Sequence, residues 1–190
     1  MTQAKDATLE DLAAIDGKAE LVGGRIRSMS PTGFLPGFAA DEIYASLREY
    51  ARRTKTGYAI ADNKGFVVNL PNRKSFSPDA AFYTGSHSGM KFLEGAPVFA
   101  VEVRSEGDYG LRAELEITQK REDYFAAGSF VVWDVDILST DVVRAYRASE
   151  PTRALIFRRG DQGNAEPAVP GWTMPVDDLF PYFTRTSENQ

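Results

Sequence analysis

This 190-residue chain contains no cysteine and a single histidine, His87. The lack of thiols excludes disulfides, thiolate zinc sites and cysteine nucleophiles. With one histidine, a single chain cannot build a metal site from two or three histidines. Any catalytic metal must therefore be bound by carboxylate and carbonyl oxygens. That ligand chemistry favours a hard cation, Mg²⁺ or Mn²⁺, with Ca²⁺ as a further option.

The lone histidine does not fit a catalytic triad. His87 lies in a small polar stretch, TGSHSGM, and no G-x-S-x-G motif accompanies it. Polar stretches of this kind form surface loops, so we interpret His87 as a solvated loop residue.

The sequence also lacks a long apolar run and a basic-then-apolar N-terminal pattern, so we expect a cytoplasmic protein without membrane association. Its net charge of −5 argues against coating nucleic acid by bulk charge, although local clusters can still act. A hydrophobic content of 43% is typical of globular proteins. The length predicts a single domain over residues 1–190, with a core at about 8–160 and a tail at 161–190, whose last residues we expect to be frayed.

Local patterns predict an α/β (α+β) fold: a mixed β-sheet flanked by helices, preceded by an N-terminal helix and a β-hairpin. Helix signals occur after the N-cap Thr8, from Phe38 to a stop at Gly57, and over 111–127. A Gly-Gly pair within residues 20–27 predicts the hairpin. Apolar runs predict further strands, at 58–61, 66–70, 80–83, 97–103, 130–135, 142–146 and 154–157.

Two carboxylates stand out against these strands. Glu102 interrupts the apolar run PVFAVEV, where an unpaired buried carboxylate costs several kcal/mol. The alternative interpretation is a glutamate already in solvent at a strand end. Asp79 follows Pro78, which removes a ladder hydrogen-bond donor, so Asp79 lies where a strand begins or bulges. Carboxylates on two neighbouring strands can converge on one divalent cation.

The helix after Glu102 offers a cation. Helical periodicity places Glu116, Gln119 and Asp123 on a solvent face, and puts Lys120 at the edge of the apolar arc. A lysine there either extends to water or points at an anion. The periodicity does not separate Lys120 from Arg121.

Taken in order, these residues resemble the Uma2 family, whose members are regarded as endonucleases related to the PD-(D/E)XK restriction-endonuclease-like superfamily. The resemblance runs from about residue 8 to residue 146. The matching pieces are Glu20-Leu-Val-Gly-Gly-Arg-Ile26, Met29-Ser-Pro31, Pro78-Asp79, Glu102-Val-Arg-Ser105, Lys120-x-x-x-Tyr124-x-x-Ala127-Gly128 and Trp133-x-Val135-Asp136.

The resemblance implies a metal site at the strand ends of a restriction-endonuclease-like core. It implies that Asp79 and Glu102 are metal ligands, and that Glu20 is an extra site acid. The superfamily's lysine two residues after the glutamate is Arg104 here, and the family's relocated lysine matches Lys120. This sequence departs from the family's pattern at two positions. Family members commonly have a histidine at the start of the helix that begins here near Phe38, and this chain has none there. They also commonly have a glutamate at the position of Val131.

On this basis we expect a Mg²⁺- or Mn²⁺-dependent endonuclease that hydrolyses phosphodiester bonds in DNA. The ion would lie between Asp79 and Glu102, with the carbonyl of Val103 as a third ligand. Lys120 would orient or deprotonate the water, and Arg104 would clamp a phosphate oxygen.

DNA is the expected partner, and the sequence is also compatible with a homodimer. Residues 48–74 carry seven basic side chains against two acidic ones, which either contact DNA or form a solvated face. The basic residues are Arg48, Arg52, Arg53, Lys55, Lys64, Arg73 and Lys74.

Two other functions stay open on the sequence alone. One is a protein that keeps the fold without turnover and acts as a DNA- or partner-binding module. The other is a carboxylate-based hydrolase of a small phosphate ester.

Overall fold

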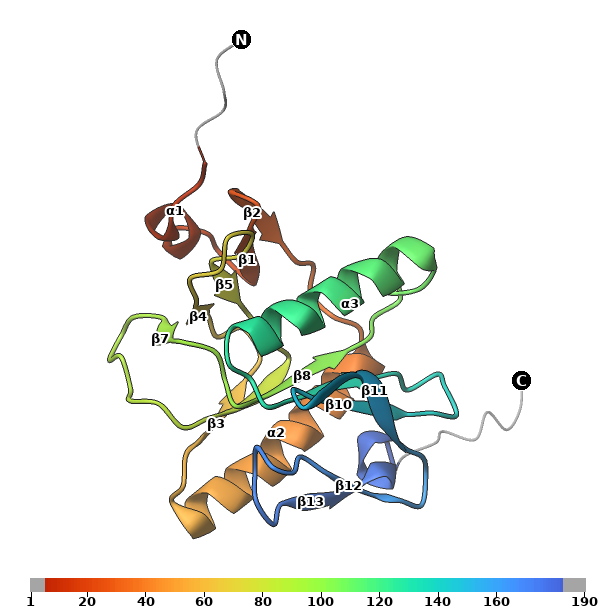
Figure 1. The fold of residues 1–190 in the computed structure, drawn as a ribbon. Coiled ribbons are helices and arrows are strands. Elements are labelled where there is room, and N and C mark those ends of the chain that lie inside the picture. The colour runs from red at the N-terminus through yellow and green to blue at the C-terminus, as the bar shows by residue number, and fades with distance from the viewer. Residues whose placement is uncertain (1–5, 183–190) are drawn as a thin grey trace, which may run out of the picture.

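The structure is a computed structural model and describes residues 6–182. Its centre is a six-stranded mixed sheet in the order β11-β10-β9-β8-β6-β3 (Figure 1). β8 and β9 are parallel, and the other neighbours are antiparallel. These strands are β3 Tyr58–Ala61, β6 Ala80–Tyr83, β8 Phe99–Val103, β9 Val131–Val135, β10 Val143–Arg147 and β11 Glu150–Phe157. The predicted mixed sheet is confirmed.

Two long helices cover opposite faces of this sheet (Figure 1). On one face, α2 (Phe34–Thr54) packs Ile43 and Leu47 against the odd-numbered residues of β8, including Val101. On the other face, α3 (Leu111–Ala126) packs Tyr124 against Ala100. Glu102 lies two residues after Ala100, so strand alternation puts it on the α3 face.

The N-terminal part lies on the same side of the main sheet as α3. It contains α1 (Leu9–Ala13), β1 (Ala19–Val22) and β2 (Arg25–Ser28). Thr8 caps α1 in a capping box with Asp11, and both hairpin glycines have positive φ angles, so the predicted cap and hairpin are confirmed.

A small three-stranded sheet supports this hairpin. It has the order β5-β4-β7, with β4 Phe66–Val67, β5 Ser75–Phe76 and β7 Leu93–Glu94. The Leu21 N–H donates to Ser75 Oγ at 2.8 Å, and the Lys74 N–H donates to the Leu21 carbonyl at 2.8 Å. These bonds hold β1 beside β5, which places Glu20 over the main sheet.

The boundaries of α2 differ from the predicted ones. The helix begins at Phe34, before the expected Phe38, because Pro36 lies in the first turn, where a missing N–H costs nothing. It ends at Thr54, and Lys55 closes it in a left-handed conformation with a φ of 58°, so Gly57 is not the stop.

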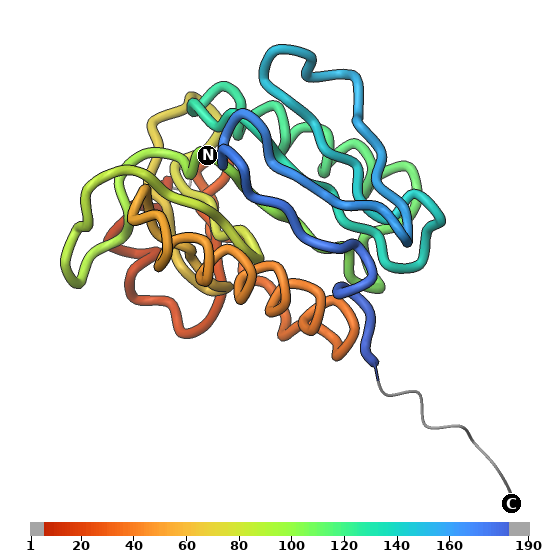
Figure 2. The backbone as a smooth tube through the Cα atoms, turned by 90° about the horizontal axis from the view of Figure 1, so that it is seen from below, coloured from red at the N-terminus to blue at the C-terminus, as the bar shows by residue number. Residues whose placement is uncertain are grey.

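The segment after Gly160 packs into the core, although its composition suggests a tail. It contains β12 (Gln162–Asn164), β13 (Thr173–Pro175) and η1 (Val176–Leu179). Seen from below, this segment runs alongside α2 (Figure 2). Trp172 is 2% exposed and packs on Phe99 and Trp133 of the sheet. The residues expected to be frayed, 186–190, lie outside the described residues.

Within residues 6–182, no helix is both long enough and apolar enough to cross a bilayer.

Candidate active site

Asp79 lies directly before β6 and bonds to β8 through both its backbone and its carboxylate. Its N–H donates to the Val101 carbonyl at 3.0 Å, and its Oδ2 accepts from the Val103 N–H at 2.7 Å. A proline has no N–H, so the strand cannot continue its regular pairing with β8 there. These two bonds flank Glu102 on β8, and they bring the two predicted acids side by side.

Helix α3 contacts Glu102 through two side chains one turn apart. Lys120 Nζ donates to Glu102 Oε2 at 2.7 Å, and the Tyr124 hydroxyl donates to Oε1 at 2.7 Å. The next residue, Arg121, instead stacks on the Tyr146 ring at 3.7 Å. Helix position therefore selects Lys120, a choice that sequence periodicity left open.

Glu20 completes this cluster from the N-terminal hairpin. Its Oε1 lies 2.9 Å from Lys120 Nζ, so one ammonium holds Glu20 and Glu102 together. Its Oε2 accepts from Arg73 at 2.5 Å, and Arg73 also donates to Asp123 at 2.8 Å. Asp123 is buried in this network, so its predicted place on the solvent face is wrong. Arg73 is likewise 5% exposed and does not belong to a surface patch.

Lys18 is a site residue that sequence reasoning missed. Its Nζ lies 2.5 Å from Asp79 Oδ1 and 2.6 Å from Asp62 Oδ1, so it bridges the ends of β6 and β3. The available signal was its spacing, because residues two apart in a strand share a face and Lys18 precedes Glu20 by two.

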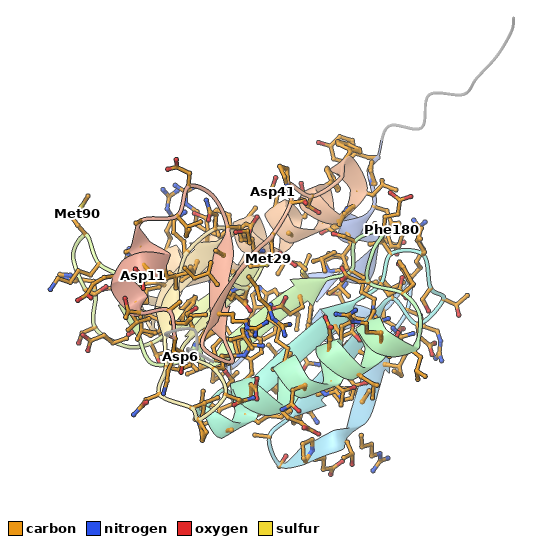
Figure 3. All side chains as sticks on the ribbon, turned by 90° about the horizontal axis from the view of Figure 1, so that it is seen from above. Asp6, Asp11, Met29, Asp41, Met90 and Phe180 are labelled. Carbon is orange, nitrogen blue, oxygen red and sulfur yellow. The ribbon has the colours of Figure 1, made fainter. Side chains whose placement is uncertain are left out.

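A pocket of about 210 Å³ opens beside Asp79. Its walls come from the ends of β3, β6 and β8, from the segment before α2 and from the first turns of α2, whose position Asp41 marks in Figure 3. The lining residues include Thr32, Gly37, Asp62, Asp79 and Val103. The pocket opens the Asp79 side of the cluster to a small ligand, and its lining carries three carboxylates, Asp41, Asp62 and Asp79.

Burial and neighbouring charges shift the pKa values of this cluster. Burial raises the pKa of Glu102 to about 6, with help from Asp79 and Glu20 and against the opposing effect of Lys120. Burial alone would lower the pKa of Lys120, but the two glutamates outweigh it and raise that pKa above its ordinary value. Lys120 is therefore an ammonium at neutral pH. It does not fit the expected role of deprotonating water, although it can still orient a ligand or neutralise charge.

The donor set fits a hard divalent cation. The cluster holds five carboxylates (Glu20, Asp62, Asp79, Glu102, Asp123) and three cations (Lys18, Arg73, Lys120). Its acids therefore exceed its bases by two charges, which one Mg²⁺ would neutralise. Mg²⁺ typically uses one or two carboxylates and keeps several waters. Among residues 6–182, no group of three or more acidic or histidine side chains is arranged to hold a metal.

Arg104 lies apart from this cluster. Its guanidinium donates twice to Asp134 at 2.7 Å and also pairs with Glu114. The side chain thereby joins β8, β9 and α3, and its donors face carboxylates. The Val103 N–H bonds Asp79, as described above, and Val103 also lines the pocket.

Two comparisons define the class to which this architecture belongs. A crystal structure from Anabaena variabilis, described as a "putative nuclease belonging to DUF820", superposes with a TM-score of 0.71 at 14% sequence identity. The match covers 92% of this chain and 97% of that chain, which shows a shared restriction-endonuclease-like fold. No match was found among curated proteins.

The family model of Uma2, described as "Putative restriction endonuclease", matches residues 7–181. The chain belongs to the Uma2 family.

Proposed function

We propose that this protein is an endonuclease that hydrolyses phosphodiester bonds in DNA with Mg²⁺ or Mn²⁺ bound by Asp79 and Glu102. The observation that carries the proposal is the cluster itself: two acids from neighbouring strands, beside a pocket, with a helix lysine bonded to one of them. Structural cores rarely retain such an excess of buried and half-buried carboxylates, because an uncompensated charge is costly to desolvate.

The roles of the residues follow from their contacts. Asp79 and Glu102 would hold the ion, with the Val103 carbonyl as a further oxygen and Glu20 as an outer acid. When bound, such an ion makes a water more acidic and offsets charge on the phosphate. Lys120, fixed by Glu20 and Glu102, would place its ammonium against the phosphate oxygens as negative charge develops there. Tyr124 would hold Glu102 in its orientation.

The decisive experiment is a cleavage assay on supercoiled and single-stranded DNA with Mg²⁺, Mn²⁺ or EDTA. We expect cleavage with either ion and none with EDTA. Asp79→Asn and Glu102→Gln should each abolish it, whereas the matched changes Asp178→Asn and Glu122→Gln, at exposed positions away from the cluster, should not. A parent protein that never cleaves DNA with either ion would overturn the proposal.

Lys120→Gln tests the chemical step separately. Loss of a positioned cation or proton-transfer group typically costs ~10²–10⁴ in rate. We therefore expect cleavage to fall by about that factor while DNA affinity stays within about threefold, as measured by anisotropy in EDTA. Cleavage at the parental rate would exclude Lys120 from the reaction.

A second candidate, a binding module without turnover, is favoured by one observation. Lys18 Nζ already pairs with both Asp79 and Asp62, so part of the negative charge at the site is offset by the protein's own cation. The two candidates differ in ion binding: a module of this kind would bind DNA equally well with Mg²⁺ or EDTA and would not be stabilised by the ion.

A further inference from the structure

We propose that a second groove, at the opposite end of β3 and β6 from the carboxylate cluster, binds the backbone of single-stranded DNA. This inference rests on the proposed function, because the DNA segment in the groove would belong to the same DNA strand that enters the carboxylate cluster. The groove has a volume of about 740 Å³ and lies between the second half of α2, the start of β3 and the loop after β6.

Three cations line this groove from the end of α2. Arg48 and Arg52 are four residues apart, which places them on one helix face, and Lys55 directly follows the last helical residue. All three are exposed, and none forms an ion pair or a side-chain hydrogen bond with any of residues 6–182. Favourable interaction with the helix dipole explains cations in the last turn, such as Arg52, but does not explain Arg48.

Several other exposed arginines of the molecule are paired, although Arg25 and Arg27 on β2 are not paired with any described residue. Arg112 contacts Glu116, Arg158 contacts Asp141, and Arg159 contacts Asp177. The chain as a whole is acidic, with a net charge of −5. Unpaired like charges side by side on one helix face repel one another, and an anionic ligand in the groove would relieve that repulsion.

The groove also offers aromatic and hydroxyl groups. The Tyr58 side chain is 50% exposed at the start of β3, and Tyr44 lines the opposite wall. Ser86 and His87 come from the loop after β6. A cationic track with exposed aromatic rings is typical of single-strand binding, because an unpaired base can stack on a ring while the phosphates contact the cations. A duplex keeps its bases stacked inside, so the exposed tyrosine favours a single strand.

The two sites lie on one path along the sheet edge. β3 is the outermost strand; Tyr58 opens it at the groove, and Asp62 follows it at the carboxylate cluster. Four residue steps along a strand span roughly 13 Å. Helix α2 lines both sites, with Gly37 near the cluster and Arg48 in the groove. A single DNA strand could therefore occupy both sites.

The test measures binding without turnover. The affinity of a fluorescent 12-nucleotide single strand is measured in EDTA over a range of salt concentrations. The variant Arg48→Gln/Arg52→Gln is compared with Arg112→Gln/Arg153→Gln, which removes the same charge from exposed positions on α3 and β11. Each neutralised phosphate contributes about 0.7 to the slope of log affinity against log salt.

We expect the groove variant to lose at least about fivefold in affinity, and to lower the salt slope by about 1.4 for two contacts. The control variant should change affinity less than about twofold. Tyr58→Leu should weaken binding severalfold without changing the salt slope, because stacking releases no counterions. Arg48→Lys/Arg52→Lys should restore most of the affinity.

Equal losses in the groove and control variants would mean that bulk charge alone matters, and would overturn the inference. Inorganic phosphate or a 5′-mononucleotide competing as well as the oligonucleotide would show a small-anion site instead. Tighter, groove-dependent binding of duplex would overturn the single-strand assignment. Groove-dependent binding without cleavage in Mg²⁺ or Mn²⁺ would refute the proposed function alone. Cleavage that occurs without groove-dependent binding would refute this inference alone.

Discussion

At the scale of single residues, two lysines connect the acids of the candidate site. Each lysine bridges two carboxylates from different parts of the chain. Lys120 joins Glu20 to Glu102, and Lys18 joins Asp62 to Asp79. The arrangement keeps acids close that would otherwise repel, because an ammonium between two carboxylates offsets their mutual charge. A bound divalent ion would compete with these lysines for the same oxygens.

Replacing Lys18 tests this competition directly. Lys18→Met should lower the unfolding free energy by about 2 kcal/mol without an ion, because Asp62 and Asp79 then face each other unpaired, with partial solvent screening. Millimolar Mg²⁺ should restore much of this loss, giving a larger rise in melting temperature than in the parent. Lys91→Met, at an exposed position with no side-chain contact described, is the control. Equal Mg²⁺ effects in all three proteins would contradict this account.

The raised pKa of Glu102 predicts a pH dependence. Its folded-state pKa of about 6 lies above the ordinary 4.5, so its proton stabilises the ion-free fold below about pH 4.5, and this contribution is lost as the pH rises through 6. Ion binding has the opposite dependence, because a protonated carboxyl is a poor ligand. The Mg²⁺-induced rise in melting temperature should therefore be small at pH 5 and full at pH 7.5.

Glu102→Gln is the matched control for that experiment. With no carboxylate to titrate at this position, its response to Mg²⁺ should be small and flat between pH 5 and 7.5. A parent response that is also flat would exclude Glu102 from ion binding.

At the scale of elements, two ion-pair networks fix α3 on the sheet. The network around Arg73 ties the turn before β5 to α3 and to the hairpin, through Asp123 and Glu20. The network around Arg104 ties β8 to β9 and to the first turns of α3. Together they set where Lys120 lies, although neither arginine contacts Glu102 or Asp79.

This arrangement changes the expected effect of mutating Arg104. Arg104→Gln should lower the unfolding free energy by about 3 kcal/mol, because it leaves the buried Asp134 carboxylate without its cation. It should leave the salt dependence of DNA binding unchanged, since an arginine held by two carboxylates releases few counterions from DNA. Denaturant unfolding and anisotropy measure the two quantities. A reduced salt slope in a protein of normal stability would instead support the phosphate contact expected from the sequence.

At the scale of the whole molecule, the C-terminal segment completes the core beneath α2. Trp172 packs on Phe99 and Trp133, and its indole N–H donates to Ser46 Oγ at 3.0 Å. Met174 and Leu179 are buried in the same cluster. The segment therefore supports the helix that lines both the carboxylate pocket and the basic groove.

Trp172→Ala should consequently destabilise the protein by about 3–5 kcal/mol, the usual cost of removing a buried aromatic side chain. Leu138→Ala, at a position 73% exposed, should change stability by less than about 0.5 kcal/mol. Chemical denaturation measures both variants. A small loss at Trp172 would mean that this segment is peripheral, as its composition suggests.

The sequence by itself determined the elements whose signals are local. The capping box at Thr8, the Gly-Gly hairpin, the sheet strands and the two long helices were all predictable, because caps, turns and side-chain periodicity depend on neighbours within a few residues. Asp79, Glu102 and Lys120 could also be identified, since a proline before a strand, an acid in an apolar run and a base at a helix edge are local anomalies.

Only the tertiary structure decided which of these groups meet. Lys18 and Arg73 gave no strong local signal, because their partners are 61 and 53 residues away along the chain. Burial of Asp123 and the pairing of Arg104 with Asp134 likewise depend on how α3 and β9 pack, which helical periodicity cannot specify. The protonation of Lys120 was decided in the same way: one buried ammonium between two glutamates keeps its proton, and that geometry exists only in the folded chain.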